Sequence, residues 1–176
     1  LQMAIQLLKR HRDIYFKNNM DVAPISIIIT TLAAKAYRGE ENVYDTIKTL
    51  LNHMQDFVEN RYGVYWVQNP VMAEENFADK WGKYPERRLA FFEWIEKAKE
   101  DLLIMPLNTQ GLHKIGNKLE KSLGEAPVIR ALSNLAKDAK EAREGGLLYT
   151  AGLTKGLTND KSESIATVKK HTFYGK

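Results

Sequence analysis

The sequence predicts a mostly α-helical protein: a bundle of about six or seven helices followed by a flexible C-terminal tail. Apolar residues recur at spacings of three and four along most of the chain, and prolines and glycines flank these stretches, where helices begin and end. Hydrophobic residues make up 44% of the 176 residues and charged residues 27%, which is typical of a folded globular protein. We expect the helical lobe to span residues 1–153 and the tail residues 154–176.

The first helix is predicted to begin at Leu1 and to end before a turn at Asn18-Asn19. Its shared face carries Ile5, Leu8, Arg12 and Tyr15. No polar capping residue precedes Leu1, so we interpret the chain as a fragment of a longer protein that begins near a helix start.

The next two helices follow from capping signals and periodicity. Asp21 is predicted to cap the second helix, with Pro24 in its first turn and an end near Tyr37. A third helix is expected over residues 42–60, because apolar residues recur there at helical spacing and polar residues occupy the opposite face.

The remaining elements are an extended segment and three more helices. Residues 63–70 are aromatic and end in Asn-Pro, which favours extended backbone. Helices are predicted from Pro85 to about Leu103, where Pro106 ends the first of them, and at 112–123 and 127–143. The buried stripe of the first of these helices is expected to contain Leu89, Phe92, Ile95, Ala98 and Leu102.

Several classes of enzyme are excluded by what the sequence lacks. There is no P-loop, no G-x-S-x-G motif and no cysteine. The four histidines stand on separate segments without metal-ligand spacing, which predicts surface residues and no metal site. We therefore expect no catalytic residue in this chain. The histidines are His11, His53, His113 and His171.

Net charge and composition limit the classes of partner that this chain is expected to bind. The net charge of +4 is too small to indicate nucleic-acid binding, and the tryptophans (Trp66, Trp81 and Trp94) stand in apolar segments where core packing is the simpler role. No apolar run is long enough to span a bilayer, so no membrane partner is expected. The absence of cysteine suits a cytoplasmic location.

Two residues near the start are candidates for phosphate binding. Lys9 stands at the edge of an apolar stripe in a helix with a local charge of +3 over residues 1–17, and an ammonium there can be presented to a triphosphate. Ser26 stands at the start of the second helix, where a hydroxyl and free N–H groups suit a phosphate oxygen. The alternatives are a basic solvent-facing surface for Lys9 and an ordinary helix-start serine for Ser26.

Three stretches carry a resemblance to a known family: LLKRHRDIYF, APISIIITTLAAKAY and VYWVQNPVMAEENFADKWGKYPERRLAFFEWIEKAK. They resemble the C-terminal half of the bacterial cGAS/DncV-like nucleotidyltransferases, relatives of oligoadenylate synthetase and poly(A) polymerases that make cyclic di- or oligonucleotide signals in anti-phage defence. NPVMAEENFADKW is the most specific part. The resemblance covers about residues 1–103 and fades beyond them.

The resemblance implies that this chain is the helical lobe of a two-lobed enzyme. A palm lobe absent from the sequence would hold two Mg²⁺ ions on a carboxylate triad, while this lobe would close the donor nucleoside triphosphate site. Lys9 would contact the triphosphate and Ser26 a phosphate or ribose. Asn69 and Asn76 resemble the family's structural asparagines, which tie the extended segment to the helices, and a binding role is the alternative.

The end of the chain suggests a second partner. VKKHTFYGK resembles the terminal segment that some family members present to a partner similar to ubiquitin-activating (E1/E2-like) enzymes for conjugation, which points to Phe173, Tyr174 and Gly175. A plain disordered terminus is the equal alternative.

The leading hypothesis is thus a lobe of a cyclic-oligonucleotide synthase, inactive by itself, with nucleoside triphosphates and its own palm lobe as partners. The alternative is a non-catalytic helical interaction module that keeps the architecture of the lobe.

Overall fold

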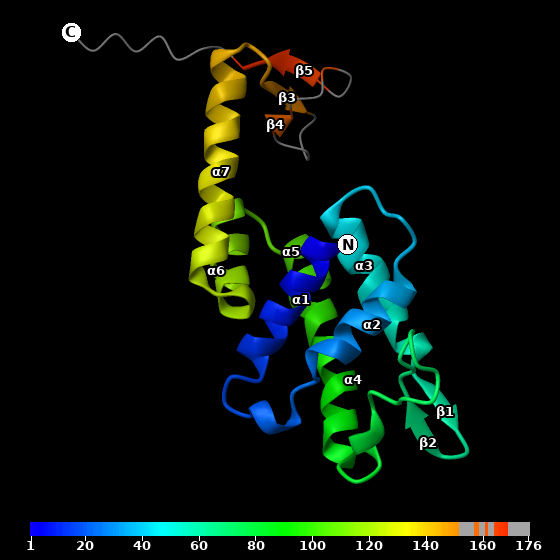
Figure 1. Ribbon diagram of the computed structural model, residues 1–176. Coiled ribbons are helices and arrows are strands. Elements are labelled where there is room, and N and C mark those ends of the chain that lie inside the picture. Colours follow the sequence, from blue (N-terminus) through cyan, green and yellow to red (C-terminus); the bar gives the residue numbers. More distant parts are fainter. Residues whose placement is uncertain (152–156, 159–160, 162–163, 169–176) are drawn as a thin grey trace, which may run out of the picture. The chain divides into compact units, whose positions relative to one another are not determined.

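The computed structural model describes residues 1–151, 157–158, 161 and 164–168. The chain divides into two compact units, residues 1–125 and residues 126–176 (Figure 1). The predicted mostly helical fold is confirmed, since six helices of eleven residues or more lie within the described ranges. The boundary predicted at 153/154 differs from this division and stays a prediction.

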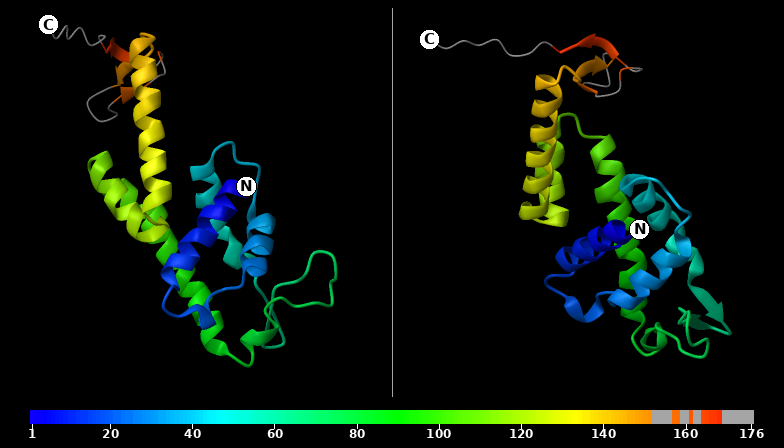
Figure 2. Two further views of the ribbon diagram at one scale, coloured as in Figure 1. Left: turned by 60° about the vertical axis from the view of Figure 1, so that its left-hand side comes forward. Right: turned by 45° about the horizontal axis from the view of Figure 1, so that its top comes forward.

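Four helices form the centre of the first unit. They are α1 (Gln2–Tyr15), α2 (Ser26–Ala36), α3 (Val43–His53) and α4 (Pro85–Lys99). α1 packs against the other three, and α3 also packs against α4, so α1 is held on several sides (Figures 1 and 2). α1 carries Lys9, one of the two residues predicted to bind phosphate.

The core lies between these helices. α2 buries Ile28, Ile29, Leu32, Ala33 and Ala36, so its β-branched run forms a buried helix, as predicted. α4 contributes large aromatic residues, and Trp81 stacks near Phe91 with ring centroids 5.3 Å apart. Trp81 and Trp94 are buried, as predicted. The largest fully buried side chains are Trp94, Phe91, Leu8, Ile28, Ile29, Leu32, Leu50, Leu51, Met54 and Ile95.

The buried face of α4 differs from the predicted one. Leu89 is 53% exposed, whereas Phe91 and Trp94 are fully buried. Ile95 and Ala98 lie in the core as expected. The stripe is rotated because the helix must bury its largest aromatic rings, and the periodicity of a helix with apolar residues on most sides does not decide which face that is.

The end of α4 also differs from the prediction. The helix continues through a π-helical turn (η4, Glu100–Ile104) into a short α5 (Met105–Leu107), so Pro106 lies inside the last turn instead of ending the helix. Pro106 cannot donate to the preceding turn, and it directly follows the π-helical turn, where the regular α-helical hydrogen-bond pattern is already interrupted. The chain then turns into α6 (Leu112–Leu123), which packs on α1.

Two further predictions about helix ends are corrected. Asp21 does not cap α2. It lies in a short 3-10 turn (η1, Met20–Val22), and α2 begins after Ile25 without a side-chain cap. α3 ends at His53 and a second 3-10 turn follows (η2, Met54–Phe57).

A small β-hairpin occupies the part of the chain where the third helix was expected to end. Strand β1 (Glu59–Arg61) pairs antiparallel with β2 (Val64–Trp66), in the register Glu59 to Trp66. Tyr62 and Gly63 both have positive φ, as a two-residue hairpin turn requires. Trp66 is half-buried beneath the Arg61 guanidinium, 4.5 Å from its ring centroid. A 3-10 turn (η3, Asp79–Trp81) then leads to α4.

The second unit begins with most of α7 (Glu125–Glu144) and continues into three short strands. β3 (Tyr149–Ala151) pairs with both β4 (Leu157–Thr158) and β5 (Ser164–Thr167). The sequence did not predict these strands, and two of them, β4 and β5, fall within the predicted tail. Among the described residues, no helix has the length and apolar character needed to cross a membrane.

Candidate functional site

The junction between α1 and α2 brings basic and hydroxyl groups together. Arg12 extends from α1, and its Nη1 donates to the Pro24 carbonyl at 2.7 Å and to Ser26 Oγ at 3.2 Å. Its other terminal nitrogen, Nη2, lies 2.6 Å from Asp13 Oδ1. The guanidinium thus ties the start of α2 to α1.

Ser26 is the first residue of α2 and is half-buried. Its hydroxyl oxygen accepts from Arg12, so the hydroxyl hydrogen remains able to donate to another acceptor. Its carbonyl accepts from Thr30 Oγ1 at 2.8 Å. The free N–H groups of the first turn of α2 lie beside it, which suits an anion.

Lys9 lies one helical turn before Arg12 on α1, so both project from neighbouring positions of the helix. It is half-buried, and in the part of the chain that the structure describes no carboxylate lies within ion-pair distance of its ammonium. Arg12 thus contacts Ser26 directly, and Lys9 lies one helical turn before Arg12 on the same helix.

Arg10 has a different role from its two basic neighbours. Its Nε donates to the Leu123 carbonyl at 3.0 Å, which satisfies the C-terminal end of α6. The adjacent Gly124 has φ +84°, and a Cβ there would lie 2.6 Å from Arg10 Nη2. The two arginines of this basic stretch thus contact different helices, Arg12 the start of α2 and Arg10 the end of α6.

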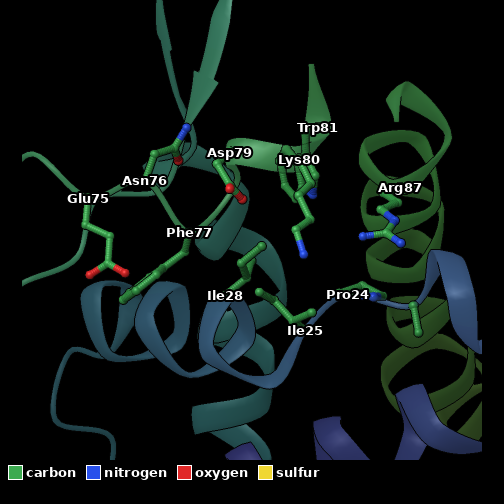
Figure 3. Close-up of a pocket in the computed structure, with 11 residues that line it drawn as sticks. Pro24, Ile25, Ile28, Glu75, Asn76, Phe77, Asp79, Lys80, Trp81 and Arg87 are labelled. Atoms are coloured by element: carbon green, nitrogen blue, oxygen red, sulfur yellow. The ribbon is translucent and has the colours of Figure 1, made fainter. Parts of the chain in front are cut away.

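A pocket of about 430 Å³ opens beside the start of α2 (Figure 3). Pro24 and Ile25, the two residues before Ser26, form part of its wall. Ile28 extends this apolar wall by one turn. Opposite them lie Asn76, Phe77 and Trp81.

Charged groups line the same pocket. Lys80 and Arg87 extend toward the same open space in Figure 3, one from the 3-10 turn and the other from α4. Glu75 and Asp79 also line it, so the lining holds two positive and two negative groups. Arg87 also lies over the Tyr84 ring, 4.9 Å from its centroid. Such a mixed polar and aromatic pocket suits a small polar ligand with a flat ring.

The two predicted asparagines hold the loop that forms this pocket. Asn76 Oδ1 accepts from the N–H groups of Val67 and Ala78, both at 2.9 Å, and its Nδ2 donates to the Tyr65 carbonyl at 2.9 Å. Asn69 donates from Nδ2 to Glu75 and accepts at Oδ1 from the Val71 N–H at 2.9 Å. Every strong hydrogen-bonding position of Asn76 except one amide hydrogen is used within the protein.

His11 contradicts the prediction of a surface histidine, because it is 1% exposed. Its Nδ1 accepts from the Trp94 indole N–H at 3.1 Å, so Nε2 must carry the proton and donate to Asp101 at 3.2 Å. Burial lowers the pKa of His11 below its ordinary value of 6.5, with Asp101 opposing the shift. The neutral imidazole fixes α1 to α4 through a buried polar contact.

Asp101 is held in turn by Lys97, whose ammonium lies 2.9 Å from it and 2.9 Å from Glu100. These two carboxylates raise the pKa of Lys97, Glu100 first. A series of hydrogen bonds and an ion pair therefore runs from Trp94 in the core through His11 and Asp101 to Lys97.

No metal centre forms among the described ranges: no group of three or more His, Asp or Glu side chains there could hold an ion. The described residues therefore offer no site for the two Mg²⁺ ions, which the resemblance assigns to the palm lobe, and no metal-dependent step is assigned to them. Phe173, Tyr174 and Gly175 lie outside the described residues.

Sequence reasoning missed Arg12, Lys80 and Arg87 as parts of this region. Arg12 had a signal, because it stands three residues after Lys9 and so on a neighbouring part of the helix surface. Lys80 and Arg87 had none, since they meet only through the packing of the turn against α4.

Comparison with known proteins shows similarity to a curated protein in sequence and to a solved structure in fold. No family model matches the chain. The chain is 33% identical to a c-di-GMP synthase of Roseivirga ehrenbergii over an alignment of 180 residues. This alignment covers 99% of this chain and 46% of that protein. Its fold is similar to that of the Bradyrhizobium diazoefficiens CD-NTase CdnG, solved in complex with GTP, with a TM-score of 0.59 and 20% identity over 76% of this chain and 38% of that one.

The chain thus spans less than half the length of either relative. The sequence similarity extends along nearly the whole chain, well past residue 103, where the resemblance had faded. Together with the shared helical fold, this confirms the family resemblance. The chain is a relative of the bacterial cGAS/DncV-like nucleotidyltransferases.

Proposed function

We propose that this chain is the helical lobe of a cyclic di- or oligonucleotide synthase, and that it closes the donor nucleoside triphosphate site. The observation that carries the proposal is the α1–α2 junction, where Arg12 orients Ser26; Lys9, one turn before Arg12 on α1, has no ion-pair partner among the described residues. The similarity to a c-di-GMP synthase and the GTP complex of the structural neighbour support a nucleotide substrate.

In this proposal the triphosphate meets Lys9 and the start of α2. The Lys9 ammonium acts as a point charge, and Ser26 Oγ–H with the first N–H groups of α2 donates to phosphate oxygens. Arg12 is a positioning residue, because both of its terminal nitrogens are already engaged by groups of this chain. The neighbouring pocket provides aromatic and polar surface beside the phosphates.

The chemical step is proposed to belong to a palm lobe that this chain does not contain, where two Mg²⁺ ions would activate the attacking hydroxyl. This division of labour agrees with the partial coverage of both relatives. The lobe alone is expected to form no phosphodiester bond.

The test is steady-state kinetics of the protein in its full natural length with GTP and ATP. Lys9→Ala is expected to raise KM or lower turnover by at least about tenfold, the effect of losing one charge-assisted contact. Lys114→Ala, which removes an exposed lysine of α6, serves as the matched control. Equal kinetics for the two variants would remove Lys9 from the site and favour the interaction-module alternative.

The proposed conjugation of the tail is tested separately. Truncation after Ser164 should abolish capture of an E1/E2-like partner if Phe173, Tyr174 and Gly175 are recognised. Equal capture by the intact and truncated chains would leave these residues as an ordinary terminus.

A further inference from the structure

A second pocket of about 380 Å³ lies between α1, the π-helical turn and α6, entirely within the first unit. We call it the lysine pocket, because Lys97, Lys118 and Lys121 all line it. It shares no lining residue with the pocket beside Ser26.

The lysine pocket lies on the other side of α1 from the proposed donor site. α1 contributes His11, Ile14 and Tyr15 to the pocket. At about 100° per residue, Lys9 is turned by roughly 200° from His11 around the helix axis. A ligand in the lysine pocket therefore would not touch the Lys9 ammonium.

The charge of the lining favours an anion. Three ammonium groups face one carboxylate, that of Asp101, which is engaged by Lys97. Lys118 donates to Thr109 Oγ1 at 3.1 Å, which holds its ammonium while leaving other donors free. Lys121 is exposed and has no ion-pair partner in the described part of the chain. The lining thus has an excess of two positive charges.

The rest of the lining is apolar and aromatic. Ile14 and Met105 lie beside Tyr15, which is 43% exposed. The Tyr15 ring is held by an edge-on contact with Phe16 at 4.8 Å and by a nearly parallel His11 ring at 6.4 Å. A ring that is fixed and still exposed offers a surface on which a flat group can stack.

The floor of the pocket is rigid. His11 is locked between the Trp94 indole and Asp101, and α1 and α6 are joined by the Arg10 bond to the Leu123 carbonyl. The cavity therefore exists before any ligand enters, which lowers the cost of binding.

We propose that the lysine pocket binds a small anion in which a phosphate is attached to a flat aromatic body, as in a nucleoside monophosphate. The phosphate lies against Lys118 and Lys121, and the aromatic body packs on Tyr15, Ile14 and Met105. The proposal does not depend on the proposed donor site, because the two pockets share no lining residue and Lys9 is turned away from the α1 residues that line the lysine pocket.

The test is calorimetric titration of AMP into the protein in its full natural length, in a Lys9→Ala background that weakens the donor site. The paired variant Lys118→Gln with Lys121→Gln is expected to lower AMP affinity by at least about tenfold. The matched pair Lys48→Gln with Lys83→Gln removes the same charge from two exposed lysines outside the pocket and should change affinity less than about twofold.

A second variant tests the aromatic part. Tyr15→Leu should weaken AMP while leaving the weaker binding of inorganic phosphate unchanged, and Tyr15→Phe should bind AMP normally. Inorganic phosphate binding as tightly as AMP would overturn the aromatic part. Loss of all AMP binding in Lys9→Ala, or equal affinity in both lysine pairs, would overturn the lysine pocket and leave the donor-site proposal intact.

Discussion

The buried contact of His11 predicts a specific loss of stability when its polar groups are removed. In His11→Phe the ring remains, but the Trp94 indole N–H loses its acceptor and Asp101 loses a donor. An unsatisfied buried donor costs about 1–3 kcal/mol and a lost hydrogen bond about 1 kcal/mol, so the free energy of unfolding should fall by about 2–4 kcal/mol. At about 2–4 °C per kcal/mol, Tm should fall by roughly 5–15 °C.

The assay is urea unfolding followed by far-UV circular dichroism, with His113→Phe as the matched control. His113 is exposed on α6, so its substitution should change stability by less than about 0.5 kcal/mol. A loss in His11→Phe no larger than that of the control would refute the reasoning.

A double variant isolates the hydrogen bond from the change of shape. Trp94→Phe removes the donor that His11→Phe leaves unsatisfied. The combined variant should therefore cost less than the sum of the two single losses, by about 1–2 kcal/mol. Strictly additive losses would show that the two rings contribute only by packing.

Three further predictions concern the same unit. Because burial lowers the pKa of His11 in the folded state, the imidazole takes up a proton just below pH 6.5 only when the protein is unfolded. The free energy of unfolding should therefore be constant above pH 6.5 and fall as the pH drops from 6.5 toward the folded-state pKa. Urea unfolding at several pH values should show this decrease, and a smaller one in His11→Phe. Gly124→Ala should lower the free energy of unfolding by about 1–3 kcal/mol in thermal unfolding, because Gly124 has a positive φ and Arg10 approaches it closely. Gly82 has a negative φ and open space around it, so Gly82→Ala should cost less than about 1 kcal/mol. Equal losses in the two variants would contradict this account. Asn76→Ala removes three hydrogen bonds to main-chain groups and should cost about 2–4 kcal/mol, with faster amide exchange at the N–H groups it now holds; unchanged exchange would argue against that role.

Much of the helical framework could be predicted because it depends on local patterns. Periodicity and flanking glycines located α6 at residues 112–123, as observed, and α1 and α7 within a few residues. Helix ends that depend on tertiary contacts were harder to predict from the sequence. The prediction carried α3 beyond His53, because the apolar periodicity continued although residues 54–57 form a 3-10 turn and residues 59–66 pair as a hairpin.

The site residues divide in the same way. Lys9 and Ser26 could be selected from the sequence, because a lysine beside an apolar stripe and a serine at a helix start are local features. The contact of Arg12 with Ser26 depends on the packing of α1 on α2, which the sequence does not show.

The amino-acid sequence by itself therefore determined the helical class, most helix positions, the absence of cysteine chemistry and the family resemblance. Only the tertiary structure decided that His11 is a buried hydrogen-bonded residue and that three lysines from two segments share one pocket. The physical reason is that burial and charge convergence depend on which helix faces meet. A helical pattern states which residues lie on one face, and the packing of distant segments decides what that face contacts.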